Sequence, residues 1–495
     1  MNSSKSSPKH ENKISFRLIT PFELFYQLTY MSAMASSGIA RGKVFEIAAR
    51  SSSPASEYFV AVNTLVDEMR YDYPEACRQI GLQSKSDNMK SFLLRMSDAL
   101  RSGEPLAEFL AREAEVQGED YTNEYERNIE ALKQWSNAFS SLTISVALIV
   151  IIQVISSMIS SLNVPMMLGL MGSGVMLSGF GAWIIKRSAP REVITVKPSE
   201  GSAEQKQAMR LFRLIVPLGF AGAMVMNLAG IPLGVVLIIA SALLLPIGLV
   251  STRSDKKTHK KDEEFSTFMR SVGGTASSSG TTLKQALTQI DLSSFPTLEG
   301  DIERLSKRLQ ALVDPEICWH QFGQETGSKL VSEVVAIFYG AIKIGGDPER
   351  VGYLCSLFTS KTSRLRSKRR MTSAMFAGLT TVMQAVIAGL MMFVLSVVLN
   401  FAAMVSTLMP TAEGATDGQA TINMGMASFT PAELQFLSSL TVTMIILMAV
   451  VTALAIILSD GGYKLKMTLY LSMTIFISGV SMLVVPPVVA SILTI

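Results

Sequence analysis

Long apolar stretches without a basic residue alternate with polar blocks along this chain. Lys and Arg are absent from 134–185, from 214–252, from 371–463 and from every position after Lys466. A hydrocarbon core about 30 Å thick needs roughly 20 apolar residues in a helix, so each stretch has room for one or more membrane spans. Because Lys and Arg are retained on the cytoplasmic side of a membrane, we expect every basic block to face the cytoplasm. An even number of spans must then separate successive blocks.

Turn-forming residues divide these stretches into individual spans. Asn163 and Pro165 mark an outer turn in the first stretch, and Gly230 to Pro232 divides the second. The third is interrupted by 410–431, which is rich in Thr, Ala and Gly and has no basic residue. The pattern predicts seven spans, at 139–159, 164–185, 211–229, 231–250, 376–400, 435–458 and 467–492. The N-terminus is then cytoplasmic and the C-terminus external.

The polar blocks have the pattern of helical domains. Thr20, Pro21 and Glu23 form the signature of a helix N-terminus, with a capping residue, a proline in the first turn and a capping-box glutamate. Residues 86–100 place apolar side chains three and four positions apart, and Gly103 follows as a stop signal. We therefore predict an all-α polytopic membrane protein with about seven transmembrane helices and two cytoplasmic antiparallel helical-bundle domains.

This interpretation divides the whole chain into segments. In order, they are a disordered cytoplasmic tail (1–19), a first cytoplasmic helical domain (20–137), two transmembrane helices (138–185), a cytoplasmic loop (186–210), two transmembrane helices (211–251), a second cytoplasmic helical domain (252–370), a transmembrane helix (371–409), an external loop (410–433), a transmembrane helix (434–459), a cytoplasmic turn (460–466) and a last transmembrane helix (467–495).

The two polar domains repeat one another. Three landmarks recur at an offset of about 242 residues: Ala35–Gly38 with Ala276–Gly280, Tyr73–Cys77 with Asp314–Cys318, and Gly103–Pro105 with Gly346–Pro348. A nearly constant offset at three places indicates a duplicated module, in which a helical domain leads into a membrane helix.

Composition and motifs exclude several classes of function. The net charge of +4 is too small to suggest nucleic-acid binding. The three cysteines, Cys77, Cys318 and Cys355, fit neither a disulfide framework nor a zinc site. The segment Gly38–Val44 lacks the spacing and the hydroxyl residue of a phosphate loop. No nucleophile–base pair or metal-ligand cluster stands out, so we predict no enzyme activity, metal or cofactor.

The interiors of the predicted spans contain no Asp, Glu, Lys, Arg or His. Gln153, Asn227 and Gln384 are their polar exceptions. Ion-coupled transporters need intramembrane charges, so this absence weighs against a pump or coupled carrier. Small residues from Gly169 to Ala182 recur three and four apart in the second span, a spacing that favours close helix packing over a pore lining.

A run of basic residues precedes the fifth span. It consists of Lys361, Arg364, Arg366, Lys368, Arg369 and Arg370. One interpretation is an anchor on anionic lipid headgroups. The other is a docking face for an acidic partner, and the two are compatible.

Together these features resemble the type II secretion F-domain family, the platform proteins of type IV pili, type II secretion systems and the archaellum. The resemblance rests on Phe22–Phe25, Ser37–Gly38, Gly103–Pro105 and the Ser459–Gly462 turn, within two similar helical domains that each lead into spans. The seven-span form is similar to the archaeal branch. The resemblance implies a non-enzymatic membrane protein that sits on a hexameric secretion ATPase, assembles prepilin-like or archaellin-like subunits, and forms a homodimer or a higher oligomer. It leaves open which filament is built.

Three other classes of function compete with this resemblance. A multi-pass transporter or channel component is the main alternative, but the spans mostly lack the polar groups that it would need. A receptor would have to sense through the short external loop. An intramembrane protease would need catalytic residues within the spans, and the sequence has none there.

Overall fold

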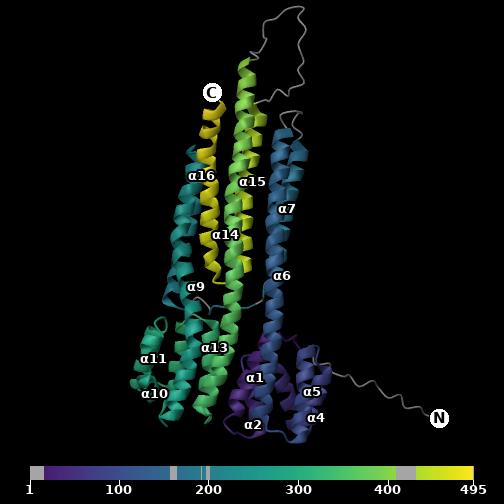
Figure 1. The fold of residues 1–495 in the computed structure, drawn as a ribbon, viewed down its shortest axis with the longest axis vertical. Helices are drawn as coiled ribbons and strands as arrows, with labels where there is room; N and C mark the ends of the chain where they lie inside the picture. Colours follow the sequence, from purple (N-terminus) through teal and green to yellow (C-terminus); the bar gives the residue numbers. More distant parts are fainter. Residues whose placement is uncertain (1–15, 157–163, 191, 197–200, 409–430, 494–495) are drawn as a thin grey trace, which may run out of the picture. The chain divides into compact units, whose positions relative to one another are not determined.

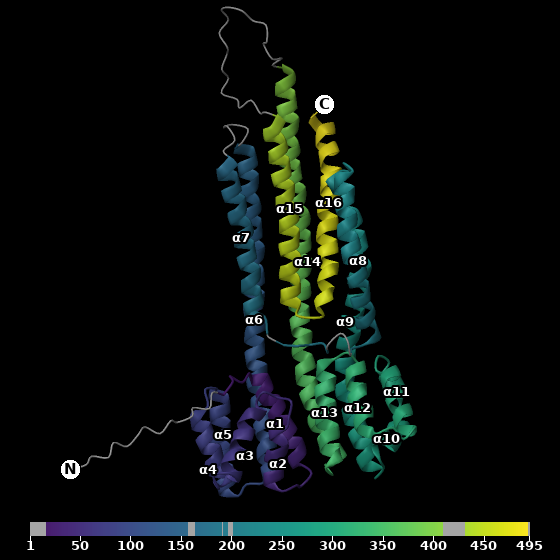
Figure 2. The ribbon, with the colours of Figure 1, turned by 180° about the vertical axis from the view of Figure 1, so that it is seen from behind.

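The computed structural model describes residues 16–156, 164–190, 192–196, 201–408 and 431–493. It divides into two compact units (Figures 1 and 2). Unit 1 comprises Met1–Glu124, Lys261–Gly323 and Leu330–Arg364. Unit 2 comprises Tyr125–Lys260, Gln324–Lys329 and Leu365–Ile495. Each unit is described by itself.

The described residues form helices and contain no strand longer than an isolated bridge between Thr195 and Ser328. Of the α-helices, α1 to α5 span Pro21–Ala35, Arg41–Ala49, Ser56–Asp67, Tyr73–Gln83 and Asp87–Ser102; α6 to α9 span Leu106–Ser156, Val164–Ser188, Ala203–Leu228 and Leu233–Ser278; α10 to α13 span Leu283–Gln289, Glu299–Gln310, Pro315–Glu325 and Lys329–Lys343; and α14 to α16 span Pro348–Leu408, Pro431–Asp460 and Met467–Leu493. Two short 3₁₀-helices, η1 and η2, lie at Leu292–Ser294 and Lys464–Lys466. The prediction of an all-α chain is confirmed.

The local signals in the sequence act as predicted. The Thr20 hydroxyl accepts a hydrogen bond from the Glu23 amide, and the Glu23 carboxylate accepts one from the Thr20 amide at 2.8 Å. This reciprocal box satisfies two of the orphan donors at the start of α1. The apolar stripe of 86–100 is the buried face of α5, which ends at Gly103 with φ = +77°.

The helix boundaries show the duplication. Four pairs of helices begin 242 residues apart: α2 and α10 at Arg41 and Leu283, α4 and α12 at Tyr73 and Pro315, α5 and α13 at Asp87 and Lys329, and α6 and α14 at Leu106 and Pro348. Residues with positive φ recur at the same interval: Gly38 and Gly280, Arg70 and Leu312, and Gly103 and Gly345. The structural equivalent of Gly103 is therefore Gly345, one position before the glycine that the sequence landmarks aligned with it.

Unit 1 has an aromatic core. In the first repeat, Phe16 stacks on Tyr58 with ring centroids 4.4 Å apart, and Phe16 and Ile19 are buried. Phe25 of α1 packs against Phe358 of α14 at 4.8 Å, so the two repeats share an aromatic contact within this unit. The predicted disordered tail extends to residue 19, but its last residues pack into the core; residues 1–15 lie outside the described part of the chain.

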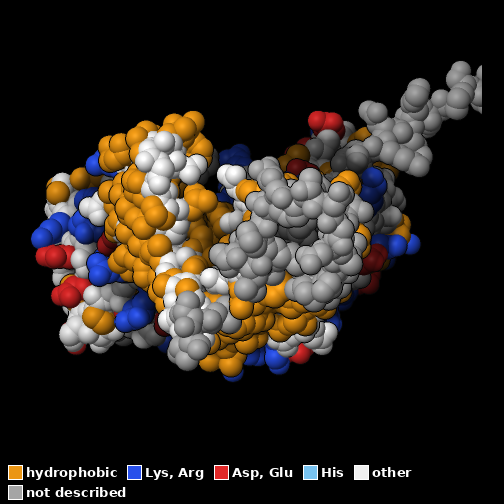
Figure 3. Space-filling model, turned by 90° about the horizontal axis from the view of Figure 1, so that it is seen from above, with side chains coloured by type: hydrophobic (Ala, Val, Ile, Leu, Met, Phe, Trp, Pro, Cys, Tyr) orange, Lys and Arg blue, Asp and Glu red, His pale blue; other side chains and the backbone are white. Residues whose placement is uncertain are grey.

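Unit 2 contains the apolar helices. Seven described helices are long and apolar enough to cross a membrane: α6, α7, α8, α9, α14, α15 and a last segment from Lys464 to Ile492. Hydrophobic side chains cover much of the described surface in Figure 3. An apolar surface of this extent is expected where helices contact lipid, so these helices form a multi-pass membrane protein.

Close helix packing explains part of the small-residue stripe in α7. A Cβ atom at Gly174 would lie 2.7 Å from Val146 of α6, and one at Gly181 would lie 2.9 Å from the Phe139 ring. A Cβ atom at Gly169 or at Gly172 would meet nothing within 4 Å. Two glycines of the stripe therefore permit the close approach of α6 and α7.

The predicted boundaries at 137 and 251 fall inside α6 and α9, because each helix continues from its polar part into its apolar part. In α9 the helix also continues past Pro246. α8 contains all but the last residue of the predicted span at 211–229, and it begins earlier, at Ala203. Most of the predicted external loop (409–430), the outer turn at Asn163 and residues 191 and 197–200 of the predicted cytoplasmic loop lie outside the described residues.

Candidate functional site

The basic run predicted as a binding site lies on α14, and its side chains have different environments. Arg364 of unit 1 is exposed, and Arg370 of unit 2 is half-buried. Lys361 and Lys368 lie partly exposed beside acidic residues of α6. Arg366 and Arg369 are buried within unit 2. The sequence prediction placed these residues on one binding face, whereas in the structure they lie on several faces of α14.

The two lysines pair with glutamates at structurally equivalent positions. Lys361 Nζ lies 2.5 Å from Glu119 Oε1 in unit 1, and Lys368 Nζ lies 2.5 Å from Glu126 Oε1 in unit 2. Each pair is separated by 242 residues, the interval between the two repeats. The basic run thus meets an acidic helix of its own chain.

The buried arginines bind groups far away in the sequence. Arg366 donates from Nε and Nη2 to Glu192 Oε1 at 2.8 and 2.6 Å. The two side chains are only 1% and 5% exposed. Arg369 donates to the carbonyl oxygens of Ser459 and Pro190 at 3.0 and 2.9 Å. Both guanidinium groups therefore hold Pro190, Glu192 and the end of α15 against α14, and they are not available to another molecule in this arrangement.

A second buried charge cluster ties α9 to the turn between α15 and α16. Lys466 Nζ lies 2.8 Å from Asp460 Oδ2 and 3.2 Å from Asp255 Oδ2, and all three side chains are at most 7% exposed. The Tyr463 amide donates to Asp255 at 3.2 Å. In the sequence this turn contributed only to the family resemblance. A buried lysine needs counter-charges. Asp460 lies six residues from Lys466, whereas Asp255 lies 211 residues away and is brought to it by the fold.

The glycines of this turn are needed for space as well as for backbone conformation. Gly461 has φ = +66°, and a Cβ atom there would overlap the guanidinium group of Arg369. A Cβ atom at Gly462 would lie 2.7 Å from Asp255 Oδ1. The turn therefore packs directly on the buried arginine and on the charge cluster.

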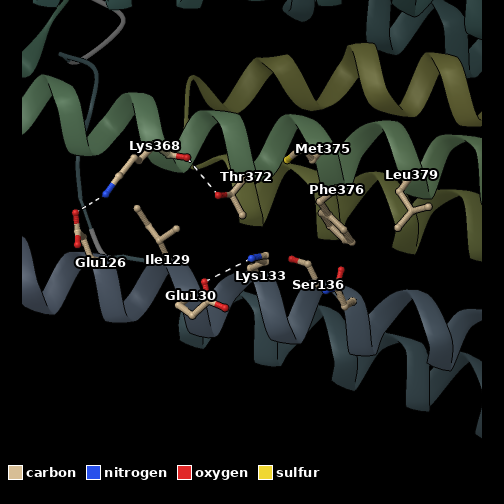
Figure 4. A pocket seen from close by; sticks show the side chains of 11 residues that line it. Glu126, Ile129, Glu130, Lys133, Ser136, Lys368, Thr372, Met375, Phe376 and Leu379 are labelled. Atoms are coloured by element: carbon tan, nitrogen blue, oxygen red, sulfur yellow. Dashed lines mark hydrogen bonds and ion pairs between the residues drawn. The ribbon is translucent and has the colours of Figure 1, made fainter.

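An amphipathic groove of about 590 Å³ runs between α6 and α14 in unit 2. Its polar end carries the Lys368–Glu126 pair and the pair of Lys133 with Glu130 (Figure 4). Its other end is lined by Met375, Phe376 and Leu379 of α14. The positive and negative charges in the groove balance, so it is not a strongly basic surface.

A second groove, of about 470 Å³, is almost wholly apolar. It lies between α8, α9 and the start of α16, and it is lined among others by Phe212, Phe220, Leu243 and Leu471. The most apolar part of α8 buries none of its residues inside the molecule. This face of unit 2 therefore presents apolar side chains to the membrane or to another apolar helix.

Comparison with known proteins identifies a domain in the first part of the chain. The family model "Type II secretion system (T2SS), protein F" matches residues 28–154, from α1 to the end of α6. These residues therefore carry a type II secretion F domain. The match covers the first repeat and the membrane helix into which it leads.

Two curated relatives align with longer stretches of the chain. The "Flagella accessory protein J" of Methanocaldococcus jannaschii is 25% identical over 330 residues, which cover 63% of this chain and 58% of that protein. The protein of the same name from Methanococcus voltae is 23% identical over 443 residues, which cover 87% of this chain and 78% of that protein. The first alignment thus spans little more than half of the relative. No solved structure matches the chain.

Sequence reasoning missed the acidic partners of the basic run. Residues 106–133 of α6 contain eight acidic and three basic residues, whereas the equivalent 348–375 of α14 contains one acidic and seven basic residues. Comparison of charges at the 242-residue interval would have placed Glu119 opposite Lys361. Nothing local would have indicated Glu192, because its partner lies 174 residues away.

Proposed function

We propose that this chain is the membrane platform of an archaellum or a related type IV filament or secretion machine. In this role it couples a cytoplasmic hexameric secretion ATPase to the assembly of prepilin-like subunits. The observation that carries the proposal is the F-domain match over the first repeat, together with relatives named as flagella accessory proteins. The chain acts as a mechanical component and not as an enzyme.

The fold supports this role by its continuous helices. Both α6 and α14 contain a charged segment and an apolar segment within one helix. A helix without a break transmits a displacement along its axis, because every turn is hydrogen-bonded to the next. Movement imposed on the charged segments by an ATPase would therefore reach the spans directly.

The apolar groove between α8, α9 and α16 supports the second half of the proposal. A prepilin-like subunit carries an apolar helix that must leave the bilayer, and apolar helices associate in lipid through close van der Waals packing. The exposed face of α8 offers such a surface. The distribution of Lys and Arg favours an orientation with unit 1 in the cytoplasm, where an ATPase could reach it.

Affinity purification from native membranes tests the proposal. The tagged full-length chain is solubilised in a mild detergent, and co-purifying proteins are identified by mass spectrometry, with an unrelated tagged multi-pass protein as the control. We expect a secretion-type ATPase or prepilin-like subunits specifically with this chain. Purification without an ATPase, from a membrane in which that ATPase is expressed, would contradict the proposal and favour a transporter or channel component.

Charge reversal tests whether the basic run takes part. Arg364→Glu with Arg370→Glu changes the two members that take no part in the ion pairs and hydrogen bonds described above, and we expect loss of filaments. The matched control is Arg41→Glu with Lys85→Glu, two exposed basic residues of the first repeat. Normal filaments from a stably inserted Arg364/Arg370 variant would remove these arginines from the mechanism.

A further inference from the structure

The paired charges on α6 and α14 have the geometry of a two-fold symmetric helix pair. Glu119 forms an ion pair with Lys361, and Glu126 forms one with Lys368, so each residue contacts its own equivalent in the other repeat. Residues that lie next to a two-fold axis contact their own symmetry mates. The two pairs are seven residues apart along each helix, which returns to the same face after two turns. The two helices therefore pair in parallel and in register at these positions.

The charges on the two helices are opposite. At both positions α6 supplies a glutamate and α14 a lysine. A pair of two α6 helices in the same register would place glutamate against glutamate, and a pair of two α14 helices would place lysine against lysine. Like charges facing each other across a helix pair oppose association, and such contacts determine which helices pair in coiled coils.

The surrounding sequence extends this opposition. The equivalent segments 106–133 and 348–375 carry net charges of −5 and +6 from their acidic and basic side chains. The spans, by contrast, carry no such signal, because their interiors are uncharged. Among the described parts of α6 and α14, the charged segments are thus the ones that can distinguish one repeat from the other.

Gly118 lies directly beside the first pair. A Cβ atom at this position would lie 2.9 Å from Cε2 of Phe25 in α1 and 3.2 Å from Nζ of Lys361 in α14. Glycine within a helix is unfavourable, so its presence needs a local reason. The Phe25 ring, with the Lys361 ammonium group beside it, supplies one.

We propose that the Glu119–Lys361 and Glu126–Lys368 pairs form a pairing code that directs the acidic helix of the first repeat to the basic helix of the second. The partner of α6 is α14 of the same chain. The same charges oppose pairing of like repeats when two copies of the chain meet in the membrane, so assembly of several copies must use other surfaces. The proposal is independent of the function proposed above and holds whatever machine the chain serves.

A charge swap in the full-length chain tests the code. The variants are Glu119→Lys with Glu126→Lys, Lys361→Glu with Lys368→Glu, and the combination of all four changes, each purified in mild detergent. We expect each double variant to unfold at a temperature lower by roughly 2 °C than the original chain, and the fourfold variant to return close to the original value. Lys43→Glu, in the exposed Lys43–Glu46 pair of α2, is the control for reversing a surface charge.

Carbodiimide cross-linking identifies the partner directly, because it joins an amine to a neighbouring carboxylate. We expect Glu119–Lys361 and Glu126–Lys368 cross-links in the monomer band of the original chain, and cross-links at the same positions in the fourfold variant. Three results would each overturn the proposal. The double variants could unfold at the same temperature as the original chain, or the fourfold variant could unfold at a temperature no higher than that of the double variants. The third is that the cross-links are found solely in a dimer band.

Discussion

The buried pair of Arg366 and Glu192 gives the sharpest test of how the basic run is used. The two side chains are 1% and 5% exposed, and Arg366 makes two hydrogen bonds to one carboxylate oxygen of Glu192. Replacing Arg366 with methionine keeps the length of the side chain but leaves the carboxylate of Glu192 buried without this counter-charge. Breaking a buried pair on one side costs about 3–5 kcal/mol of unfolding free energy.

A neighbouring residue supplies the comparison. Lys368 makes a pair of similar length with Glu126, but these side chains are 50% and 44% exposed. Exposed pairs contribute about 0–1 kcal/mol, because water already solvates both charges. Lys368→Met should therefore cost no more than about 1 kcal/mol. Two basic residues of one run, two positions apart, should differ several-fold in their contribution to stability.

A double-mutant cycle separates the pair from the rest of Arg366. Glu192→Gln removes the charge, so Arg366→Met combined with Glu192→Gln leaves neither a buried arginine nor a buried carboxylate. We expect the double variant to recover about 2 kcal/mol or more relative to the sum of the single changes. Unfolding can be followed by tryptophan fluorescence in a Trp319→Phe background, which leaves Trp135 and Trp183 as probes of unit 2.

Two outcomes would refute this reasoning. If Arg366→Met costs less than about 1 kcal/mol, like Lys368→Met, then Glu192 does not depend on its buried partner. If the single and double variants are equally unstable, the arginine contributes through packing and not through its charge.

Two further predictions follow from the turn between α15 and α16 and from the core of unit 1. Gly461→Ala should destabilise unit 2 by more than the roughly 1 kcal/mol of a strained backbone alone, because its Cβ atom would also displace the guanidinium group of Arg369. Thermal unfolding in detergent measures this effect. A variant as stable as the original would contradict the close packing of the turn. Burial raises the pKa of the Cys77 thiol to about 12, so the folded protein holds this proton more tightly than the unfolded chain. The resulting contribution to the free energy of unfolding is present below the unfolded pKa of about 8.5 and is lost as the pH rises above it. Maleimide labelling of Cys77 near pH 8 should accordingly be slow until unit 1 unfolds, and rapid labelling of the folded protein would disprove its protection.

The sequence by itself determined the elements whose causes are local. Apolar length and the absence of Lys and Arg located the seven long apolar helices, because the membrane imposes a length and a composition on each span independently of its neighbours. The capping box at Thr20 and the left-handed Gly103 are likewise satisfied within a few residues of chain. The duplication could be recognised from the sequence because the turn residues of the two copies recur at a nearly constant interval of about 242 residues.

The tertiary structure decided what the charged residues do. From the sequence alone, the six basic residues shared one predicted role. The fold instead buries Arg366 against Glu192, buries Arg369 against backbone carbonyl groups, and sets Lys361 and Lys368 beside acids of α6. A charge is a property of one residue, whereas its energy depends on burial and on the distance to a partner. Here those partners lie 90 to 242 residues away. The repeat interval indicates the acids of α6, but only the packing of the helices identifies Glu192 and the backbone of Ser459.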